Sequence, residues 1–370
     1  MKKIYFLTNI PTPYRNHFFN CMYEAGEKRG IDIKVYYMAK TERGRFWNYR
    51  DWIIKYNYDF LKNYGFYFKN IYFHFNPSVI AKLKREKPDY LVVAGAWNMP
   101  TVMYLMFFKF LLPSIKMGFW NEGNIRDEIY SKKTVIKKLK KFIYNRFDSL
   151  ISSGMKSDEL IKYYVKNPKI IKLYNVVNDS IFRNDNRVDF SVPRKLFIVA
   201  KLNERKNVFV YLKSIYPLLK DNLVKIKVAG EGEDKKQIES WIKENNLKDS
   251  IKLLGQISES EIIKELKNSD IFVLPSRREP FSLSLVEASF MAMPLLISEK
   301  IGAVPDIINK NGITFDPFSA EDIYEKTKKM ITYDDSFLKI MSDNSRKNAL
   351  ENFSSKKVTE IFIDDLLKTI

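Results

Sequence analysis

The sequence predicts an α/β protein of two doubly wound domains, and three observations predict it: the length, a repeating rhythm and one break in that rhythm. The chain has 370 residues, more than one ordinary domain holds. Short β-branched or aromatic runs alternate with longer helical patterns, which is typical of βαβ units with a parallel sheet. The alternation stops at the polar segment 186–195, which contains Pro193, and then resumes. Two such domains facing each other would enclose a cleft, with ligands at the carboxyl ends of the strands.

The domains are expected over residues 1–185 and 196–355, with 186–195 as the linker. In the first domain, strands are predicted at 4–8, 33–37, 90–94, 115–120, 149–152 and 170–174. In the second, they are predicted at 196–200, 225–229, 251–254, 271–274, 294–298 and 313–315. Apolar residues make up 45% of the chain and charged residues 29%, a balance typical of globular proteins and not of disordered ones.

Two apolar stretches are too short or too interrupted to enter a membrane. The N-terminal run ends before Pro11, so it is expected to form a strand and not a signal peptide. The stretch 90–108 contains Gly95 and Pro100, which favours a strand, a loop and a helix over a membrane span. Cys21 is the single cysteine, which excludes an intramolecular disulfide and fits a reducing cytoplasm.

The positive charge is concentrated in the first domain. The chain carries a net charge of +19. Residues 1–185 contain 33 Lys and Arg against 16 Asp and Glu, or +17, whereas the remainder contains 30 against 28, or +2. The first domain is therefore expected to face a polyanion, and the charge alone leaves open a lipid surface, a nucleic acid or a phosphorylated acceptor.

Segment 131–146 predicts a basic amphipathic helix. Apolar residues from Val135 to Ile143 recur at helical spacing on one side. The other side is expected to carry Lys132, Lys133, Lys137, Lys138, Lys140 and Lys141. Two interpretations stay open: a surface helix with a solvated lysine face, or contact with anionic lipid, to which each lysine would contribute on the order of 1 kcal/mol. The aromatic and basic segment 43–75 is either a partly buried excursion off the sheet or an acceptor- or membrane-facing element.

The segment that points most directly to chemistry is 275–288, which reads PSRREPFSLSLVEA after a predicted strand. It holds Glu279 and Glu287, eight residues apart. Pro280 keeps Glu279 outside the following helix, because a residue before proline avoids the α-helical conformation. The helix N-terminus near 282–284 presents free backbone N–H groups and a partial positive charge, which together favour an anion.

This segment resembles the E-x7-E signature of the retaining glycosyltransferases of family 4, which have the GT-B fold of two facing Rossmann-like domains. Other stretches are similar to motifs of the same family: 200–207 to its phosphate loop, 229–232 to its G-x-G turn, 254–257 to the turn beside the base, and 302–306 to a later turn. Segments 10–15 and 175–179 resemble the family in the first domain. The resemblance also implies that the last helix, 356–370, packs back on the first domain.

The resemblance implies a role for each matching residue. Lys201 and Lys206 would compensate the donor diphosphate, Glu279 would bind the donor sugar, and Glu287 would accept hydrogen bonds from the ribose. The rest of the donor site would comprise Phe281, Ser282, Leu283, Gly230, Gln256 and Ile257. No cofactor or metal is expected, because lysines and backbone N–H groups replace a divalent ion beside the UDP- or GDP-sugar donor.

On the acceptor side, the resemblance points to Tyr14 and Arg15. Asn121 or Glu122 would stand where the family often has a histidine, since His17 and His74 lie elsewhere in the sequence. Two further departures are Asn207 and Ser282, which replace glycines, and a third is Lys201, which replaces an arginine.

These features together predict a retaining hexosyltransferase of EC class 2.4 that acts on a glycan or polyprenyl-linked acceptor in cell-envelope polysaccharide or glycoconjugate synthesis. It is expected in the cytoplasm, peripheral on the inner face of an anionic membrane, and without a nucleic-acid partner, since no helix-turn-helix, finger or RNP-type motif is present. The alternatives are a catalytically weak GT-B homologue, a GT-B enzyme of another type, and a polyanion-binding protein.

Overall fold

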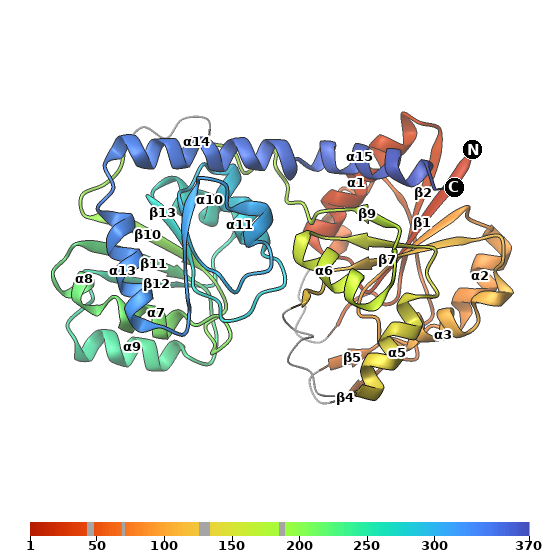
Figure 1. Ribbon diagram of the computed structural model, residues 1–370, viewed down its shortest axis with the longest axis horizontal. Helices are drawn as coiled ribbons and strands as arrows, with labels where there is room; N and C mark the ends of the chain where they lie inside the picture. Colours follow the sequence, from red (N-terminus) through yellow and green to blue (C-terminus); the bar gives the residue numbers. More distant parts are fainter. Residues whose placement is uncertain (43–47, 69–70, 126–133, 185–188, 370) are drawn as a thin grey trace. The chain divides into compact units, whose positions relative to one another are not determined.

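The computed structural model describes residues 1–42, 48–68, 71–125, 134–184 and 189–369 (Figure 1). They form two compact units. Unit 1 comprises Met1–Asn178 and Ser355–Ile370, and unit 2 comprises Asp179–Ser354. Residues 186–188 of the expected linker lie outside the described residues, and its last two residues already belong to the first strand of unit 2.

Unit 1 contains a seven-stranded sheet in which the paired strands are all parallel. In spatial order its strands are β3 (Asn57–Phe60), β2 (Ile31–Tyr37), β1 (Lys2–Thr8), β6 (Tyr90–Ala94), β7 (Lys116–Asn121), β8 (Ser149–Ser152) and β9 (Ile170–Lys172). Its helices are α1 (Pro13–Glu27), α2 (Ser78–Glu86), α3 (Pro100–Phe107), α5 (Thr134–Tyr144), α6 (Met155–Tyr164) and α15 (Ser355–Leu367), with the 3-10 turns η1 (Tyr49–Asp51) and η2 (Lys109–Leu111).

The sheet of unit 1 separates two apolar cores. Side chains alternate across β1, so Ile4 and Phe6 enter one core while Tyr5 and Leu7 enter the other. Helices α1 and α15 cover the first face, and α2, α3, α5 and α6 cover the second (Figure 1). The ring of Phe362 on α15 lies 6.5 Å from that of Phe6, so the end of the chain completes the core of unit 1.

The aromatic segment 43–75 is only partly an excursion off the sheet. Strand β3 within it pairs with β2 and extends the sheet, an edge strand that the sequence analysis did not predict. The rest includes an antiparallel hairpin of β4 (Phe66–Phe68) and β5 (Ile71–Phe73). Phe66 and Phe68 are exposed in this hairpin. Residues 43–47 lie outside the described part of the chain.

Unit 2 repeats the architecture with a six-stranded parallel sheet. In spatial order its strands are β12 (Ile251–Gly255), β11 (Val224–Ala229), β10 (Arg194–Val199), β13 (Ile271–Leu274), β14 (Leu295–Ser298) and β15 (Gly312–Phe315). Its helices are α7 (Val208–Ser214), α8 (Tyr216–Lys220), α9 (Lys235–Glu244), α10 (Glu259–Lys267), α11 (Leu283–Phe290), α12 (Val304–Ile307), α13 (Ala320–Ile331) and α14 (Asp335–Asn352).

Both sheets have a point at which the strand order reverses. In unit 1 this switch point lies between β1 and β6, and in unit 2 it lies between β10 and β13. The loops that leave two such strands diverge to opposite faces, which opens a crevice at their carboxyl ends where ligands bind. Lys206 and Glu279 lie on the loops that leave β10 and β13, and Tyr14, Arg15 and Glu122 line a pocket beside β1.

Candidate functional site

In unit 2, the loop after β10 is held in place by close backbone contacts. The amide of Leu202 donates to the carbonyl of Glu231 at 2.9 Å. A Cβ on Gly230 would lie 1.9 Å from the carbonyl oxygen of Ala200, so only glycine allows this approach. The loop that carries Lys201 therefore runs directly against the turn after β11.

Asn207, at which the resemblance implies a glycine, adopts the left-handed conformation at φ 60° just before α7. Asparagine tolerates this conformation better than most residues. Its side chain donates to the carbonyl of Pro317 at 3.0 Å and accepts from Arg277 Nε at 2.9 Å. The substitution therefore preserves the turn and ties the loop after β10 to the loop after β13.

Glu279 is the centre of a cluster of cations at the switch point of unit 2. Its Oε2 accepts a hydrogen bond and ion pair from Lys206 Nζ, and Arg205 Nη1 lies 3.1 Å from the same oxygen. The side chains of Lys206 and Glu279 are 13% and 12% exposed, whereas that of Arg205 is 47% exposed. The amide of Gly302 donates to the Glu279 carbonyl at 2.8 Å, which fixes the loop.

Helix α11 follows this loop with its N-terminus at Ser282, whose side chain does not cap the helix. Its first backbone N–H groups therefore stay available to an anion. Glu287 lies one turn further along, and burial, together with the negative charge of Glu259, raises the pKa of its carboxyl to about 7. The hydroxyl of Ser276, between β13 and this loop, is buried and without a hydrogen-bond partner among the described residues.

A second group of predicted residues lines one pocket of about 400 Å³ at the ends of β10, β11 and β12. Lys201, Gly230, Gln256 and Ile257 line it, and Ile262 of α10 adds an apolar wall. Lys201 Nζ lies 3.5 Å from Glu233 Oε1, and the lysine side chain is 59% exposed. The structure thus brings four predicted residues into one pocket and joins Lys206 to Glu279 beside α11.

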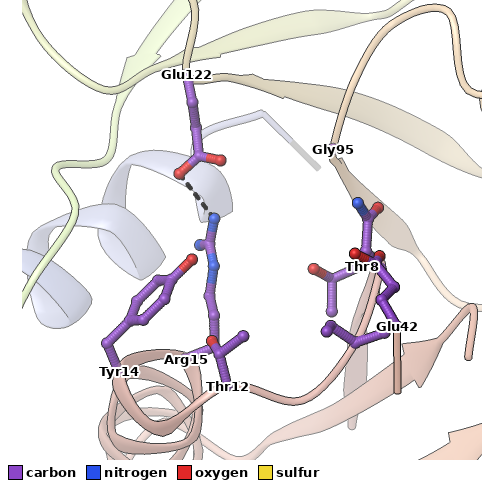
Figure 2. Close-up of a pocket in the computed structure, with 9 residues that line it drawn as sticks. Thr8, Thr12, Tyr14, Arg15, Glu42, Gly95 and Glu122 are labelled. Atoms are coloured by element: carbon purple, nitrogen blue, oxygen red, sulfur yellow. Dashed lines mark hydrogen bonds and ion pairs between the residues drawn. The ribbon is translucent and has the colours of Figure 1, made fainter. Parts of the chain in front are cut away.

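In unit 1, a polar pocket of about 130 Å³ lies at the switch point between β1 and β6 (Figure 2). Tyr14, Arg15 and Glu122, all predicted on the acceptor side, line it. Arg15 is buried, its Nη2 lies 2.8 Å from Glu122 Oε1, and its guanidinium carbon lies 3.8 Å from the centre of the Trp120 ring. Burial lowers the pKa of the Arg15 guanidinium, but the Glu122 carboxylate opposes this effect and the pKa is raised overall.

Asn121 corrects the sequence interpretation of the acceptor side. It is buried, its Nδ2 donates to Ser157 Oγ at 2.8 Å, and its Oδ1 accepts from Tyr144 at 2.9 Å. These bonds direct the side chain into the packing of α5 and α6 against the sheet, so Asn121 supports the fold. Its neighbour Glu122, the first residue after β7, lines the pocket instead.

The lysine face of α5 is smaller than the sequence predicts. Lys140 is buried, with its Nζ 4.9 Å from the centre of the Tyr164 ring and 5.9 Å from that of Trp97. The helix therefore docks through this lysine as well as through its apolar residues, an arrangement that cation–π attraction stabilises. Lys138 and Lys141 are exposed, and Lys137 is half-buried. Lys132 and Lys133 lie outside the described residues.

On the same surface, two apolar side chains that the amphipathic pattern assigns to the interior are exposed: Val135 and Phe142 of α5, at 79% and 43%. Phe107 of α3 is also exposed there, at 47%. The rings of Phe107 and Phe142 lie 5.6 Å apart. Exposed lysines and exposed aromatic rings thus share this face of unit 1, which we call the α3–α5 face.

Sequence reasoning missed two groups at these sites. Arg205 joins the Glu279 cluster, although an arginine between two lysine candidates gives no separate signal. Glu42 lines the unit 1 pocket and pairs with buried His74, 32 residues away in the chain. Within the described part of the chain, no cluster of His, Cys, Asp and Glu could hold a metal ion, and no helix is long and apolar enough to cross a membrane.

Comparison with known proteins identifies the larger part of unit 2. Residues 183–348 match the family model of glycosyl transferases group 1. This stretch is similar to the group 1 glycosyl transferases, and the match covers less than half of the chain. An uncharacterized glycosyltransferase of Methanocaldococcus jannaschii is 28% identical over 202 residues, which cover 52% of this chain and 54% of that protein. A second from the same organism is 24% identical over 337 residues, covering 78% and 80%.

The solved structures extend the likeness from residues 183–348 to the whole chain. HepE of Anabaena in complex with UDP matches with a TM-score of 0.75 at 15% identity, covering 100% of both chains. TarM of S. aureus, in a complex that includes UDP and alpha-GlcNAc-glycerol, matches with a TM-score of 0.68 at 14% identity, covering 100% of this chain and 99% of that one. The GT-B fold predicted from the sequence is thereby confirmed. The chain spans about half of the length of the first curated relatives it matches.

Proposed function

We propose that this protein is a hexosyltransferase of EC class 2.4 that transfers a sugar from a nucleotide diphosphate sugar to a glycan or lipid-linked acceptor. The observation that carries the proposal is the Glu279 cluster at the N-terminus of α11, within the stretch that matches the group 1 glycosyl transferases. Cations and free backbone N–H groups are what a diphosphate requires, and a carboxylate held among them suits the hydroxyls of a sugar.

The donor would lie across the switch point of unit 2. Its base fits the pocket formed by Gln256, Ile257 and Ile262, and its ribose hydroxyls would reach Glu287. Lys201 and Lys206 would neutralise the diphosphate, while the Glu279 carboxylate would orient the transferred sugar. That HepE and TarM were crystallised with UDP supports a uridine nucleotide over a guanosine one.

Retention of anomeric configuration without a metal is the reaction course that suits these residues. The developing charge on the leaving diphosphate would be stabilised by Lys206, Arg205 and the α11 N-terminus, an environment that needs no reorganisation during the reaction. The diphosphate itself would then accept the proton of the acceptor hydroxyl, so the donor site would need no dedicated base of its own.

The acceptor would bind unit 1, at the pocket lined by Tyr14, Arg15 and Glu122. The α3–α5 face would hold the protein on the inner surface of an anionic cell membrane, where a polyprenyl-linked acceptor of envelope polysaccharide synthesis would be presented. Lys138 and Lys141 supply the positive charge there, and Phe107 and Phe142 supply aromatic rings that suit a membrane interface.

The proposal is tested by incubating the protein with a panel of nucleotide sugars in EDTA. We expect one donor to raise the melting temperature and to be turned over slowly to nucleotide and free sugar. NMR of the glycosylated product should show the anomeric configuration of the donor. Inversion, or strict dependence on added Mg²⁺ or Mn²⁺, would contradict the mechanism, and failure of every nucleotide sugar to bind would contradict the function itself.

A further inference from the structure

The polar pocket of unit 1 contains hydrogen-bonding atoms that the protein leaves unsatisfied. Thr12 is 8% exposed and Asn9 lies beside it, and neither Thr12 Oγ1 nor Asn9 Oδ1 has a partner among the described residues. Both residues line the pocket. A buried polar atom without a partner costs roughly 1–3 kcal/mol, so a bound group that hydrogen-bonds here would recover that cost. The amide oxygen can only accept, so the bound group must bring O–H or N–H donors.

The charges that line this pocket disfavour an acidic ligand. Among the lining residues that the structure describes, Arg15 is the sole cation, and its guanidinium is already paired with Glu122 at 2.8 Å. Glu42 is a second carboxylate on the opposite side of the pocket (Figure 2). A ligand carboxylate or phosphate would therefore meet two like charges and one neutralised cation, whereas hydroxyl or ammonium groups would meet acceptors.

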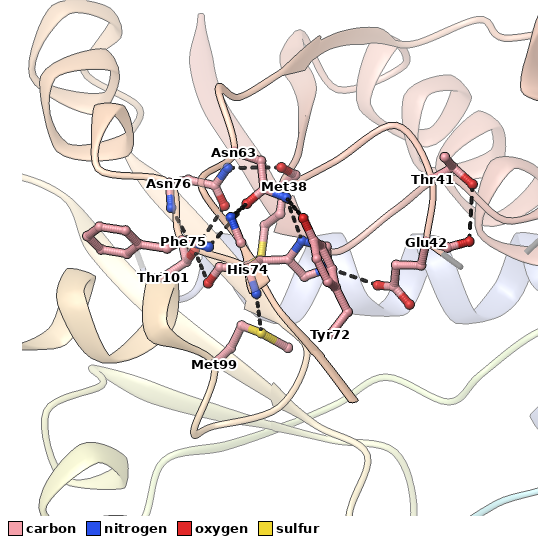
Figure 3. A network of polar contacts seen from close by, with 11 residues as sticks. Met38, Thr41, Glu42, Asn63, Tyr72, His74, Phe75, Asn76, Met99 and Thr101 are labelled. Atoms are coloured by element: carbon pink, nitrogen blue, oxygen red, sulfur yellow. Dashed lines mark hydrogen bonds and ion pairs between the residues drawn. The ribbon is translucent and has the colours of Figure 1, made fainter. Parts of the chain in front are cut away.

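A chain of hydrogen bonds fixes the orientation of Glu42 (Figure 3). The amides of Gly65 and Phe75 both donate to Asn63 Oδ1 at 3.1 Å, so Asn63 must present Nδ2 to His74 Nδ1, which lies 3.2 Å away. Because Nδ2 can only donate, His74 Nδ1 accepts and the imidazole proton resides on Nε2. Nε2 then donates to Glu42 Oε1 at 2.8 Å. His74 thus holds the carboxylate by one oxygen, and within the described part of the chain the other oxygen has no hydrogen-bond partner.

We infer that this pocket binds a non-acidic sugar unit of the acceptor, neutral or amino-substituted, whose hydroxyl or ammonium group donates to Glu42, and that buried His74 is the positioning residue for that carboxylate. Thr12, Asn9 and Glu122 complete the ring of acceptors. This inference rests on the proposed function, and it adds a substrate class together with two residues, Glu42 and His74, that sequence reasoning did not place at the site.

The test compares the binding of three methyl glycosides that share one ring: a glucoside, a 2-amino-2-deoxyglucoside and a glucuronide. Ligand-observed NMR titrations of the full chain are expected to show binding of the first two and at least fivefold weaker binding of the glucuronide. Glu42→Gln should weaken the two favoured ligands about tenfold, which is the effect of one charged hydrogen bond. Glu24→Gln makes the same chemical change on the exposed side of α1 and should leave all three titrations unchanged.

The role of His74 is separated from a general effect on folding by a double-mutant cycle. His74→Phe should weaken glucoside binding in the wild-type background but have no further effect in Glu42→Gln, because the carboxylate that it aligns is gone. Equal weakening in both backgrounds would show a purely structural role and overturn the positioning assignment.

Three outcomes would overturn the pocket assignment: binding of the glucuronide as tight as that of the glucoside, undiminished binding in Glu42→Gln, or binding of none of the three. A parallel titration with UDP and GDP distinguishes failure of the pocket assignment from failure of the proposed function. If a nucleotide binds but none of the glycosides does, the pocket assignment is contradicted and the proposed function is retained. If neither nucleotide binds, the proposed function is contradicted, and the inference that rests on it is contradicted with it.

Discussion

The two switch points of this molecule have the same topology and opposite chemistry. In unit 2, Lys201, Arg205 and Lys206 lie on the loop that leaves β10 at the switch point, where Lys201 pairs with Glu233 and the other two pair with Glu279. In unit 1, the crevice between β1 and β6 has one cation, already neutralised, and two carboxylates. The comparison teaches that the fold supplies the crevice and that a few loop residues set its charge, which on the proposed function would select an anion in one unit and hydroxyl groups in the other.

The largest expected effect comes from removing the buried cation of the unit 2 site. Lys206→Met should lower turnover roughly 100-fold, because a preorganised charge beside the leaving diphosphate is lost. Steady-state nucleotide release measures it, and Lys236→Met on α9, an exposed lysine, is the matched control. If Lys206→Met and Lys236→Met release nucleotide at the same rate, the cation cluster does not act on the diphosphate. The difference in charge between the two sites would then have no effect on the reaction.

A smaller effect separates the two glutamates of unit 2. Glu287→Ala should weaken nucleotide binding by roughly 1.5–3 kcal/mol, since the ribose loses a charged acceptor. Glu279→Ala should instead lower turnover while nucleotide affinity is kept. Calorimetric titration with the nucleotide and a turnover assay distinguish them, and an unchanged affinity in Glu287→Ala removes the ribose assignment.

The pH dependence of the free energy of unfolding should reflect the burial of the Glu287 carboxyl, even without a ligand. Its carboxyl has a pKa of about 7 in the folded state and 4.5 ordinarily. Between these two pH values the carboxyl is therefore protonated in the folded state and ionised in the unfolded state. The free energy of unfolding of the wild type should therefore fall as pH rises from about 4.5 to about 7, by on the order of 2 kcal/mol relative to Glu287→Gln. Denaturant titrations at both pH values measure it, and parallel behaviour of the two proteins would mean that the carboxyl is well solvated.

The smallest effect concerns the α3–α5 face. Replacing Lys138 and Lys141 by Gln should reduce co-sedimentation with anionic vesicles by about 1 kcal/mol per lysine, whereas the same change at Lys162 and Lys166 on α6 and just after it should matter less. Salt near 0.5 M should release the wild type, because exposed charges are screened over about 4–5 Å. Equal binding to neutral vesicles would assign attachment to the aromatic rings alone.

The sequence predicted well what depends on local patterns. Strands β6, β8 and β13 have the predicted bounds, because each is a short apolar run between helical segments. The GT-B fold is confirmed by the solved structures. The loop motifs of unit 2 gather at one sheet edge because parallel strands all end on the same side.

What the sequence could not predict depends on contacts between distant residues. In the sequence, Lys140 cannot be distinguished from the other lysines of the basic helix. Only the fold places it beside the rings of Trp97 and Tyr164. The same holds for Glu42 and His74, which meet only because the loop after β2 lies beside β5. Strand β3 was missed because it is half polar and pairs along one edge only.

The most direct test of the central claim, that the diphosphate binds at the switch point of unit 2, is a comparison of UDP with uridine as ligands. In the wild type the diphosphate should improve binding at least tenfold, and the account predicts that this advantage largely disappears in Lys206→Met while Glu42→Gln keeps it. Isothermal titration of the three proteins with both ligands gives the answer. An advantage that survives in Lys206→Met, or that is lost in Glu42→Gln, would contradict the assignment of the anion to unit 2.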